Sequence, residues 1–500
     1  MFAIIHLKEI RMRYIPPVDR AQYVMMNTLD DLVPQQHPVR ILDTVVEQIV
    51  DANPEQFDTA RADSDPGRPM FGPKTLLKLF LYGYLVNIRA SRKLETETQR
   101  NIEVLWLLGT LSPDHWVIAT YRKVHGDHIK LMTKAFRQFL HAHGYIKGER
   151  IAVDGTKMKA NAAREMLTVE KIEKRLHRVD EHLDEYLSNM ADNDLRDDLA
   201  DELDGLDSTV TVDRHLADKI IALQKQVEEL TAQKTLLEQS GQTYLSPADP
   251  DARLMKSRDG KIAAYNVQSI VDDAHHMIAA TTVLTDQDDH AALPVIVKSL
   301  REELGLSPTT VIADKGYYTP DLIERVETET NTTCYIPLPE KDTASSPVTF
   351  RYDPSTDCYT CSAGKPLVLH SKNKRRRNSV ANVYRGTQCD GCHLHAQCTT
   401  SKHGRTVHRY HNQDWREAYR ERMRHQTSMS IVALRKSLVE HPFGTIKLWG
   451  GKLPLLLRGV AKVTTEINLY ATAYNVRRLL NCTLWDTLKE QLATHSWKLA

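Results

Sequence analysis

Three acidic residues stand in sequence contexts that could bring carboxylates to a metal ion. Asp154 follows the apolar run Ile151-Ala152-Val153 and precedes Gly155 and Thr156. An acid at the end of a buried strand is costly unless a partner such as a metal ion compensates its charge, and glycine lets the chain turn at the tip. On this stretch alone, the commoner explanation is an aspartate that starts a turn or caps a helix.

Two later stretches repeat this arrangement and favour the metal interpretation. Asp314 ends the short apolar run Thr310-Val311-Ile312-Ala313, and Gly316 follows closely. Glu440 is predicted to lie on a helix, at the start of the run Glu440-His441-Pro442-Phe443-Gly444-Thr445-Ile446-Lys447. Three such carboxylates could converge on Mg²⁺ or Mn²⁺, which prefer oxygen ligands, as two-metal phosphoryl transfer requires.

These motifs resemble those of the DDE transposases of bacterial insertion sequences, in the group with an Asp-Gly-Thr first motif. The matching stretches are Asp154-Gly155-Thr156 with Lys157, Ala160 and Asn161 after it, Ala313-Asp314-Lys315-Gly316-Tyr317, and Val439 to Lys447, of which the last is the most specific. The resemblance implies that Asp154, Asp314 and Glu440 form the catalytic triad and hold two Mg²⁺ or Mn²⁺ ions. It also implies that Lys447 contacts DNA.

The chain departs from the resembled pattern just upstream of Glu440. The family often has a tyrosine three residues before an arginine. Here Arg435 or Lys436 can supply the basic residue, but Val432 and Ala433 stand where the tyrosine would be. This departure concerns the tyrosine contact to terminal DNA and not the metal site.

The activity that the resemblance implies is DNA transposition, in which the protein cuts the ends of its own insertion sequence and joins them to target DNA. The expected partner is double-stranded DNA, bound by a homodimer. Two alternatives stay open: a related nuclease without strand transfer, and a DNA-binding regulator that has lost catalysis. The presence of all three acids argues against the regulator. A zinc hydrolase is disfavoured because five clustered thiolates suit a closed structural site.

The overall composition is that of a globular protein with two oppositely charged regions. The net charge is +1, but residues 165–210 carry 15 acids against 5 bases and residues 371–425 carry 13 bases against 4 acids. The N-terminal apolar run is too short for a signal peptide, and no stretch is long enough for a bilayer span. We therefore expect a cytoplasmic, nucleoid-associated protein without a membrane partner.

The predicted fold is α/β, with a ribonuclease H-like catalytic core. The Asp154 strand, a hairpin over residues 262–284, a helix over residues 290–304 and the Asp314 strand follow one another in the order of such a core. The predicted boundaries are 1–148 for a helical N-terminal domain, 149–165 for the first core strand, 166–244 for an acidic helical hairpin insertion, 245–345 for the rest of the core, 346–411 for a Cys-rich zinc-ribbon-like insertion, and 412–500 for the helical end with the catalytic Glu. Three further acids in the core, Asp272, Asp286 and Asp289, are predicted to be turn and cap residues.

Helices are predicted around residues 101–108 and 115–124, separated by Gly109 and Ser112-Pro113-Asp114. This spacing fits a helix-turn-helix that binds DNA as well as it fits plain helical packing, and Arg122, Lys123 and His125 are the candidate contacts. In the insertion, apolar residues recur in steps of three and four on both helices, with Lys234 as a polar break. A self-contained hairpin is slightly favoured over a dimerisation arm.

Five of the seven cysteines lie within 41 residues. Cys358 and Cys361 form one C-x2-C pair, Cys389 and Cys392 form another, and Cys398 follows. Paired C-x2-C motifs are typical of structural Zn²⁺ sites. There are five cysteines for four places, His393, His395 and His403 are nearby substitutes, and an unmetallated loop is the alternative.

Basic residues near these motifs are candidate phosphate contacts, because phosphate binding dominates affinity for DNA. A run of them lies between the two C-x2-C pairs. The candidate DNA-binding residues are Lys374, Arg375, Arg376, Arg377, Arg435 and Lys447. One long helix is predicted over residues 412–445, with a bend at Pro442 and Gly444.

Overall fold

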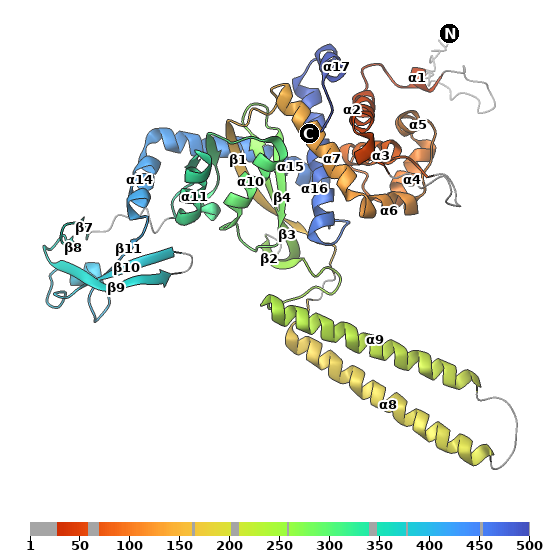
Figure 1. Cartoon of the computed structure of the whole chain (residues 1–500), viewed down its shortest axis with the longest axis horizontal. Coiled ribbons are helices and arrows are strands. Elements are labelled where there is room, and N and C mark those ends of the chain that lie inside the picture. Colours follow the sequence, from red (N-terminus) through yellow and green to blue (C-terminus); the bar gives the residue numbers. More distant parts are fainter. Residues whose placement is uncertain are drawn as a thin grey trace, which may run out of the picture.

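The computed structural model describes residues 28–58, 70–162, 166–201, 210–257, 260–339, 348–376, 379–450 and 454–499. The molecule is a mixture of helices and two β-sheets (Figure 1). In this view a six-stranded sheet lies between the N-terminal helices on one side and a five-stranded sheet on the other, and a long helical hairpin projects away. Among these residues, every helix is either too short or too polar to span a bilayer.

The chain begins with a group of helices whose ends follow local sequence signals. Asn101 caps the helix that begins at Ile102 by accepting a hydrogen bond from the Glu103 amide at 3.0 Å. Asp114 caps the helix that begins at His115 by accepting one from the Val117 amide at 2.8 Å. Gly109 ends the first of these in the left-handed conformation (φ 58°). The helices are α1 (Leu29–Leu32), α2 (Pro38–Ala52), η1 (Pro54–Gln56), α3 (Pro73–Leu85), α4 (Ser91–Arg100), α5 (Ile102–Leu108), α6 (His115–Val124) and α7 (Gly126–Ala142).

Helices α5 and α6 are the two helices that the sequence predicts, but one of the candidate DNA contacts is not available. Arg122 is buried, donates to the Arg89 carbonyl at 2.9 Å and lies over the Phe80 ring. Its charge therefore serves internal packing, and the prediction of an exposed Arg122 is wrong. Lys123 is exposed and His125 is half-buried.

The six-stranded sheet contains β1 (Arg150–Lys159), β2 (Arg253–Ser257), β3 (Gly260–Asp272), β4 (Ile278–Leu284), β5 (Thr310–Ile312) and β6 (Thr333–Tyr335). The order is β2-β3-β1-β5-β6, and β4 also pairs with β3. Strand β3 runs antiparallel to β1, β2 and β4, whereas β1, β5 and β6 are parallel. The register places Val153 opposite Ile270 and Ala152 opposite Ile312. These residues are buried, as expected for strands covered on both faces.

Helices cover the sheet and connect it to the N-terminal group. They are α10 (Ala292–Leu304), η2 (Lys315–Tyr317), α11 (Pro320–Thr330), α14 (Gln413–Arg424), α15 (Gln426–Gly450), α16 (Val460–Cys482) and α17 (Trp485–Thr494). Helix α16 packs against α3, α7 and β4, and its buried Asn475 side chain bonds both the amide (2.8 Å) and the carbonyl (2.9 Å) of Ile278. One continuous apolar core therefore joins the N-terminal helices to the sheet.

The predicted long helix over residues 412–445 is wrong in two respects. It is two helices, because His425 is extended (ψ 141°) and separates α14 from α15. Ser428 also caps the end of α14, since its hydroxyl donates to the Arg422 carbonyl at 2.6 Å. Helix α15 then continues through Pro442 to Gly450, so the helix does not end at residue 445.

A helical hairpin of α8 (Val169–Asp201) and α9 (Val210–Ser240) leaves the sheet between β1 and β2 (Figure 1). At its base, Leu167 and Leu245 exchange backbone hydrogen bonds of 2.8 and 2.9 Å. An apolar seam fills the space between the helices and contains Ile172, Val179, Leu230 and Leu237. Lys234, the predicted polar break, bonds Glu173 across the seam at 2.7 Å.

The five-stranded sheet contains β7 (Phe350–Asp353), β8 (Cys358–Cys361), β9 (Pro366–Arg376), β10 (Ser379–Gly386) and β11 (Thr406–Tyr410), with helix α13 (His395–Cys398) before the last strand. The order is β11-β10-β9-β8-β7, and all neighbours are antiparallel. Its core is small, with Tyr359, Leu367 and Tyr384 as the buried members.

Candidate active site

The structure brings Asp154 and Asp314 close together where β5 ends beside β1. Asp154 lies two residues after the segment of β1 that pairs with β5, and Asp314 lies two residues after the end of β5. Strand β1 continues through Gly155 to Lys159, so the prediction that Asp154 ends its strand and that the chain turns at Gly155 is wrong. Because β1 and β5 are parallel and adjacent, Asp154 lies beside the carboxyl end of β5. The guanidinium of Arg435 on α15 contacts both acids, with Nη2 at 2.6 Å from Asp154 Oδ1 and 3.6 Å from Asp314 Oδ2.

The two aspartates differ in their surroundings. The Asp154 side chain is 23% exposed and Asp314 is 43% exposed. Burial raises the pKa of Asp154, and the neighbouring Asp314 raises it further, while Arg435 and the Gly155 amide act in the opposite direction. Asp314 caps η2, where it accepts a hydrogen bond from the Gly316 amide at 2.7 Å. The two aspartates therefore concentrate negative charge that a cation must offset.

Glu440 lies on α15, the helix that also carries Arg435. Its two preceding residues, Leu438 and Val439, pack against Ala152 of β1 and Val271 of β3. Glu440 itself is exposed. Within the part of the chain that the structure describes, the three acids do not form a group with all carboxylates within 4.8 Å of one another. The convergence of Glu440 on the two aspartates stays a prediction.

A fourth acid, Asp289, lies beside the two aspartates. It accepts hydrogen bonds from Asn266 Nδ2 at 2.7 Å and Gln268 Nε2 at 2.6 Å. A Cβ atom on Gly155 would lie 3.0 Å from Asp289 Oδ1, and one on Gly316 would lie 3.7 Å from Asp289 Oδ2. The side chain therefore faces both motif glycines, so the prediction that Asp289 is only a turn or cap residue is wrong.

The signal for this missed acid is the alternation of buried polar residues along β3. Asn266 and Gln268 are fully buried two positions apart, so they share one face of the strand. They pair with Lys157 and Gly155 of β1. Gln268 also accepts a hydrogen bond from the Tyr317 hydroxyl. Buried amides need partners, and Asp289 supplies one.

Of the two remaining acids of the core, Asp272 behaves as the sequence predicts. Asp272 is buried and accepts backbone hydrogen bonds from Lys147 (3.1 Å), Gly148 (2.7 Å) and Ala274 (2.9 Å). It therefore fixes a turn at the other end of β1. Asp286 is exposed in the loop after β4.

The candidate DNA-binding residues are spread over two regions. Lys374 and Arg375 are exposed on β9 of the five-stranded sheet. Arg435 is half-buried against the two aspartates. Arg377 lies outside the described residues, as do the side chains of Arg376 and Lys447.

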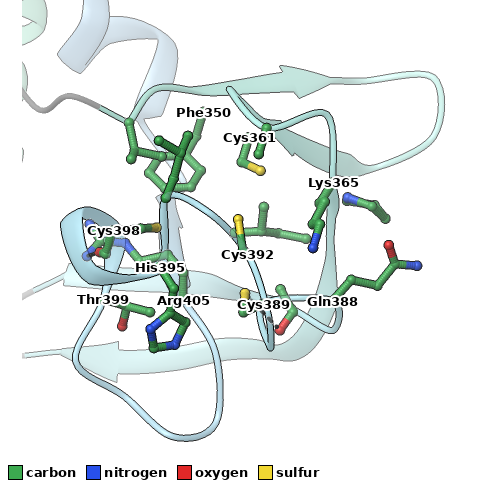
Figure 2. Close-up of a pocket in the computed structure, with 16 residues that line it drawn as sticks. Phe350, Cys361, Lys365, Gln388, Cys389, Cys392, His395, Cys398, Thr399 and Arg405 are labelled. Carbon is green, nitrogen blue, oxygen red and sulfur yellow. Dashed lines mark hydrogen bonds between the residues drawn. The ribbon is translucent and has the colours of Figure 1, made fainter.

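Four of the five clustered cysteines line one small cavity, and the fifth does not. Cys361, Cys389, Cys392 and Cys398 surround a cavity of about 30 Å³ together with His395 and Arg405 (Figure 2). Cys358 is absent from this lining, and its thiol lies 3.3 Å from the Leu367 carbonyl oxygen. Cys334 is buried, as predicted, whereas Cys482 is exposed and is not a core residue.

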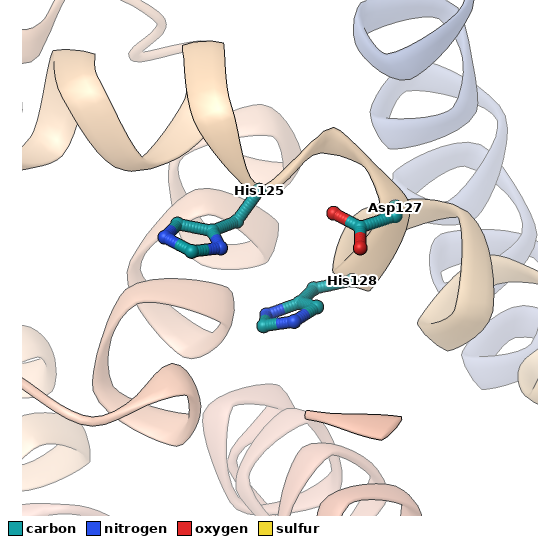
Figure 3. A group of neighbouring side chains, drawn as sticks. All are labelled: His125, Asp127 and His128. Atoms are coloured by element: carbon teal, nitrogen blue, oxygen red, sulfur yellow. The ribbon is translucent and has the colours of Figure 1, made fainter. Parts of the chain in front are cut away.

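A separate group in the N-terminal helices is less suited to a metal ion. His125, Asp127 and His128 place their ligand atoms within 4.8 Å of one another (Figure 3). The two imidazoles are stacked, however, at 5.0 Å between centroids and 29° between planes. Imidazole lone pairs lie in the ring plane, so stacked rings do not aim at one point. His128 also bonds the Tyr121 hydroxyl at 2.8 Å, which fits a role in packing.

Two segments of the chain match transposase families. Residues 27–124 match a family described as "Transposase domain (DUF772)", and residues 360–480 match a family described as "Transposase DDE domain". The second segment contains Glu440 and the cysteine cavity, whereas Asp154 and Asp314 fall outside both. The comparison with curated proteins gave no match.

A search of solved structures found similarity to a piggyBac transposase in a synaptic complex with hairpin DNA. The two chains are 11% identical, the alignment covers 92% of this chain and 85% of the other, and the TM-score is 0.22. At that TM-score the similarity carries no structural argument.

Proposed function

The chain is a DDE transposase of the insertion-sequence type, and from this premise we propose that Asp154, Asp314 and Glu440 are its catalytic carboxylates. The observation that carries the proposal is that Asp154 of β1 and Asp314, just beyond the end of the adjacent parallel strand β5, both contact one cation, Arg435. The packing of Leu438 and Val439 of α15 on β1 and β3 supports the inclusion of Glu440, which follows them on this helix.

We also propose that the six-stranded sheet is a ribonuclease H-like core with two insertions. Strand order and direction support this, because an antiparallel meander of β4, β3 and β1 is followed by the parallel strands β5 and β6. The hairpin of residues 166–244 then interrupts the core after β1. The Cys-rich segment of residues 346–411 interrupts it after β6.

The residues around Asp154 and Asp314 fit a divalent cation. DDE domains use divalent metal ions, and hard ions such as Mg²⁺ or Mn²⁺ take carboxylate oxygens. When bound, such ions stabilise the charge that develops on the attacking and leaving oxygens of a phosphodiester. Asp154, Asp314 and Glu440 would hold them. Asp289, fixed by Asn266 and Gln268, would keep the Gly155 and Gly316 backbones in place around them.

The substrate that we propose is the DNA of the element's own ends, followed by target DNA. Exposed Lys374 and Arg375 on β9 offer phosphate contacts outside the carboxylate site. Arg376, Arg377 and Lys447 would extend this contact. Such contacts position DNA without reading its sequence.

The test is a cleavage and joining assay on DNA that carries the element's ends, with Mg²⁺, comparing the wild type with Glu440→Ala. We expect both cutting and joining to be lost while DNA binding, measured by mobility shift, is retained. Glu421→Ala is the matched control, because Glu421 is an exposed acid on the preceding helix that pairs with Arg424. Wild-type cutting by the Glu440→Ala protein would mean that another acid, with Asp289 the nearest candidate, completes the site.

The same assay separates the proposal from a nuclease on the same core. A transposase yields joined molecules, in which the freed 3′ end is linked to target DNA. A nuclease yields cut ends alone. Cutting without any joined product under conditions that support end binding would favour the nuclease.

We propose that two copies act together on the paired ends. The outer surface of α9 carries exposed Ile221 and Leu236, which the seam of the hairpin does not use. The mass of the protein complex on end DNA, measured by light scattering, tests this proposal. A mass of one chain per end complex would contradict it.

A further inference from the structure

We propose that Cys361, Cys389, Cys392 and Cys398 bind one structural Zn²⁺ ion and that Cys358 is not a ligand. This inference does not depend on the carboxylate site. It selects four ligands from a cluster of five cysteines that the sequence alone leaves equivalent.

Strand geometry separates the two cysteines of the first C-x2-C pair. Cys358 and Cys361 are the first and last residues of β8, which pairs with β7 through Cys358–Asp353 and Cys361–Phe350. Side chains alternate between faces along a strand, so residues three positions apart point to opposite faces. Only one of these two thiols can therefore face the cavity, and that one is Cys361.

The second C-x2-C pair is built differently and keeps both thiols on one side. Cys389 and Cys392 flank a tight turn in which Gly391 adopts a left-handed φ of 67°, and the Cys392 amide bonds the Cys389 carbonyl at 3.3 Å. The short helix α13 then returns Cys398 to the same cavity. In Figure 2 the four sulfur atoms border a common space.

The size and shape of the cavity suit an ion and not a substrate. A cavity of about 30 Å³ has room for only one or two water-sized spheres. No three of the described sulfur atoms lie within 4.8 Å of one another, so binding would draw the thiols inward. Such contraction on binding is ordinary, because metal sites are rarely complete without their ion.

The charges around the cavity match a four-thiolate zinc site. Zn²⁺ with four thiolates carries two net negative charges, and the cavity is also lined by the cationic residues Lys365 and Arg405. Arg405 donates through Nη1 to the Cys398 carbonyl at 3.0 Å. Its Nε atom is buried and has no acceptor among the described residues, so thiolate charge nearby would compensate it.

The backbone at Gly386 and Gly404 packs closely against the Cys389 sulfur and leaves no room for a side chain there. A Cβ atom on Gly386 would lie 2.7 Å from this sulfur, and one on Gly404 would lie 3.2 Å from it. The ion would thereby link the end of β8 to the loop between β10 and β11. This link would stabilise a sheet whose own apolar core is small.

The test measures zinc in the purified full-length chain by mass spectrometry, for the wild type and for Cys358→Ser and Cys361→Ser. These variants form a matched pair, because both cysteines are half-buried and lie in the same motif. We expect about one zinc ion per chain in the wild type and in Cys358→Ser, and loss of most of it in Cys361→Ser. Equal loss in both variants, or a wild type without zinc, would overturn the proposal.

Replacing the bound zinc with Co²⁺ gives a second measurement, which does not rely on a variant that can lose zinc because it fails to fold. Co²⁺ bound to thiolates gives charge-transfer absorption whose strength follows the number of sulfur ligands. We expect the wild type, Cys358→Ser and His395→Ala to give the same four-thiolate spectrum. A weaker spectrum in His395→Ala would show that His395 replaces one of the four cysteines, which would contradict the ligand set.

Discussion

The two β-sheets of this protein hold their functional side chains by different means. The six-stranded sheet is part of the main apolar core, and strands β1, β3 and β5 are buried around Asp154 and Asp314. The five-stranded sheet has three fully buried apolar residues in its own cluster. The proposed catalytic site thus lies in the well-packed main core, whereas the cysteine cavity lies in a sheet with a small apolar cluster of its own.

This difference indicates what each site does for the fold. Charged groups against a packed sheet cost stability, and the chemistry that we propose for Asp154 and Asp314 would account for their presence there. A metal link in a sheet with little core contributes stability instead. The carboxylates should therefore be removable without unfolding, and the zinc ligands should not.

The largest effect that would sharpen this contrast is expected for Asp154→Ala. In the role that we propose, its carboxylate would hold a metal ion that stabilises transition-state charge by several kcal/mol, so strand cleavage should fall by about a thousandfold. Zinc content and the unfolding temperature should stay at wild-type values. The partner variant is Cys392→Ser, which should lose zinc and destabilise residues 348–411 to hydrogen exchange. Loss of zinc in Asp154→Ala would break the contrast.

A smaller effect is expected when a structural acid of the six-stranded sheet is removed. Asp272→Ala leaves three backbone amides without their acceptor, and the Gly148 amide among them is buried, so we expect a loss of about 4 kcal/mol in unfolding free energy. Denaturant titration measures this loss. Asp273→Ala is the control, because its pair with Arg150 is 3.0 Å long and largely exposed, and should cost less than about 1 kcal/mol. Equal losses would contradict a structural role that is special to Asp272.

The next effect concerns the packing of the cysteine cavity. Gly404 has a φ of 84°, and a Cβ atom there would lie 2.4 Å from the Gly386 carbonyl oxygen. Gly404→Ala should cost about 3 kcal/mol, from left-handed strain and overpacking together. Gly364→Ala is the matched control, because φ is 75° but nothing lies within 4 Å of its Cβ position. It should cost only about 1 kcal/mol from strain. Thermal unfolding and zinc retention would show whether the two variants differ.

The smallest effect is the pH dependence of stability at Asp272. Burial raises the pKa of this carboxyl, although its three backbone hydrogen bonds oppose the shift. The folded state therefore holds the proton more tightly than the unfolded state, so this group lowers stability as pH rises from the ordinary aspartate pKa through the raised one. Relative to wild type, Asp272→Asn should gain stability over that acidic range and level off above it. A difference that does not change with pH would contradict the raised pKa.

Sequence patterns predicted the parts of the site that depend on local structure. Asp154 and Asp314 each follow a run of apolar residues that forms a strand, and the pairing of β1 with β5 brings them together, although β1 continues past Asp154 and Gly155. Asp289 was misjudged because the direction of a loop side chain depends on partners in β3 that only the tertiary structure supplies. The sequence also could not distinguish Cys358 from Cys361 as a zinc ligand. A C-x2-C motif has the same spacing in a turn, where both thiols can face one side, and in a strand, where they cannot.

The sequence predicted only those helix ends that are set by local contacts. Asn101, Gly109 and Asp114 mark real boundaries because their caps are local. The break between α14 and α15 at His425 is not marked by a glycine or a proline. It depends on the hydrogen bond from the Ser428 hydroxyl to the Arg422 carbonyl. Its position therefore could not be read from composition.

Leu167 and Leu245 pair at the base of the hairpin and close it there. The length of the two helices beyond this pair can therefore change without altering the sheet. Excising seven residues from α8 and the facing seven from α9 would shorten the limb by about 10 Å, at 1.5 Å per residue. The same apolar faces would still oppose each other, because seven residues are close to two helical turns. A protein built in this way can change how far it extends from its own centre while the spacing of Asp154 and Asp314 stays the same.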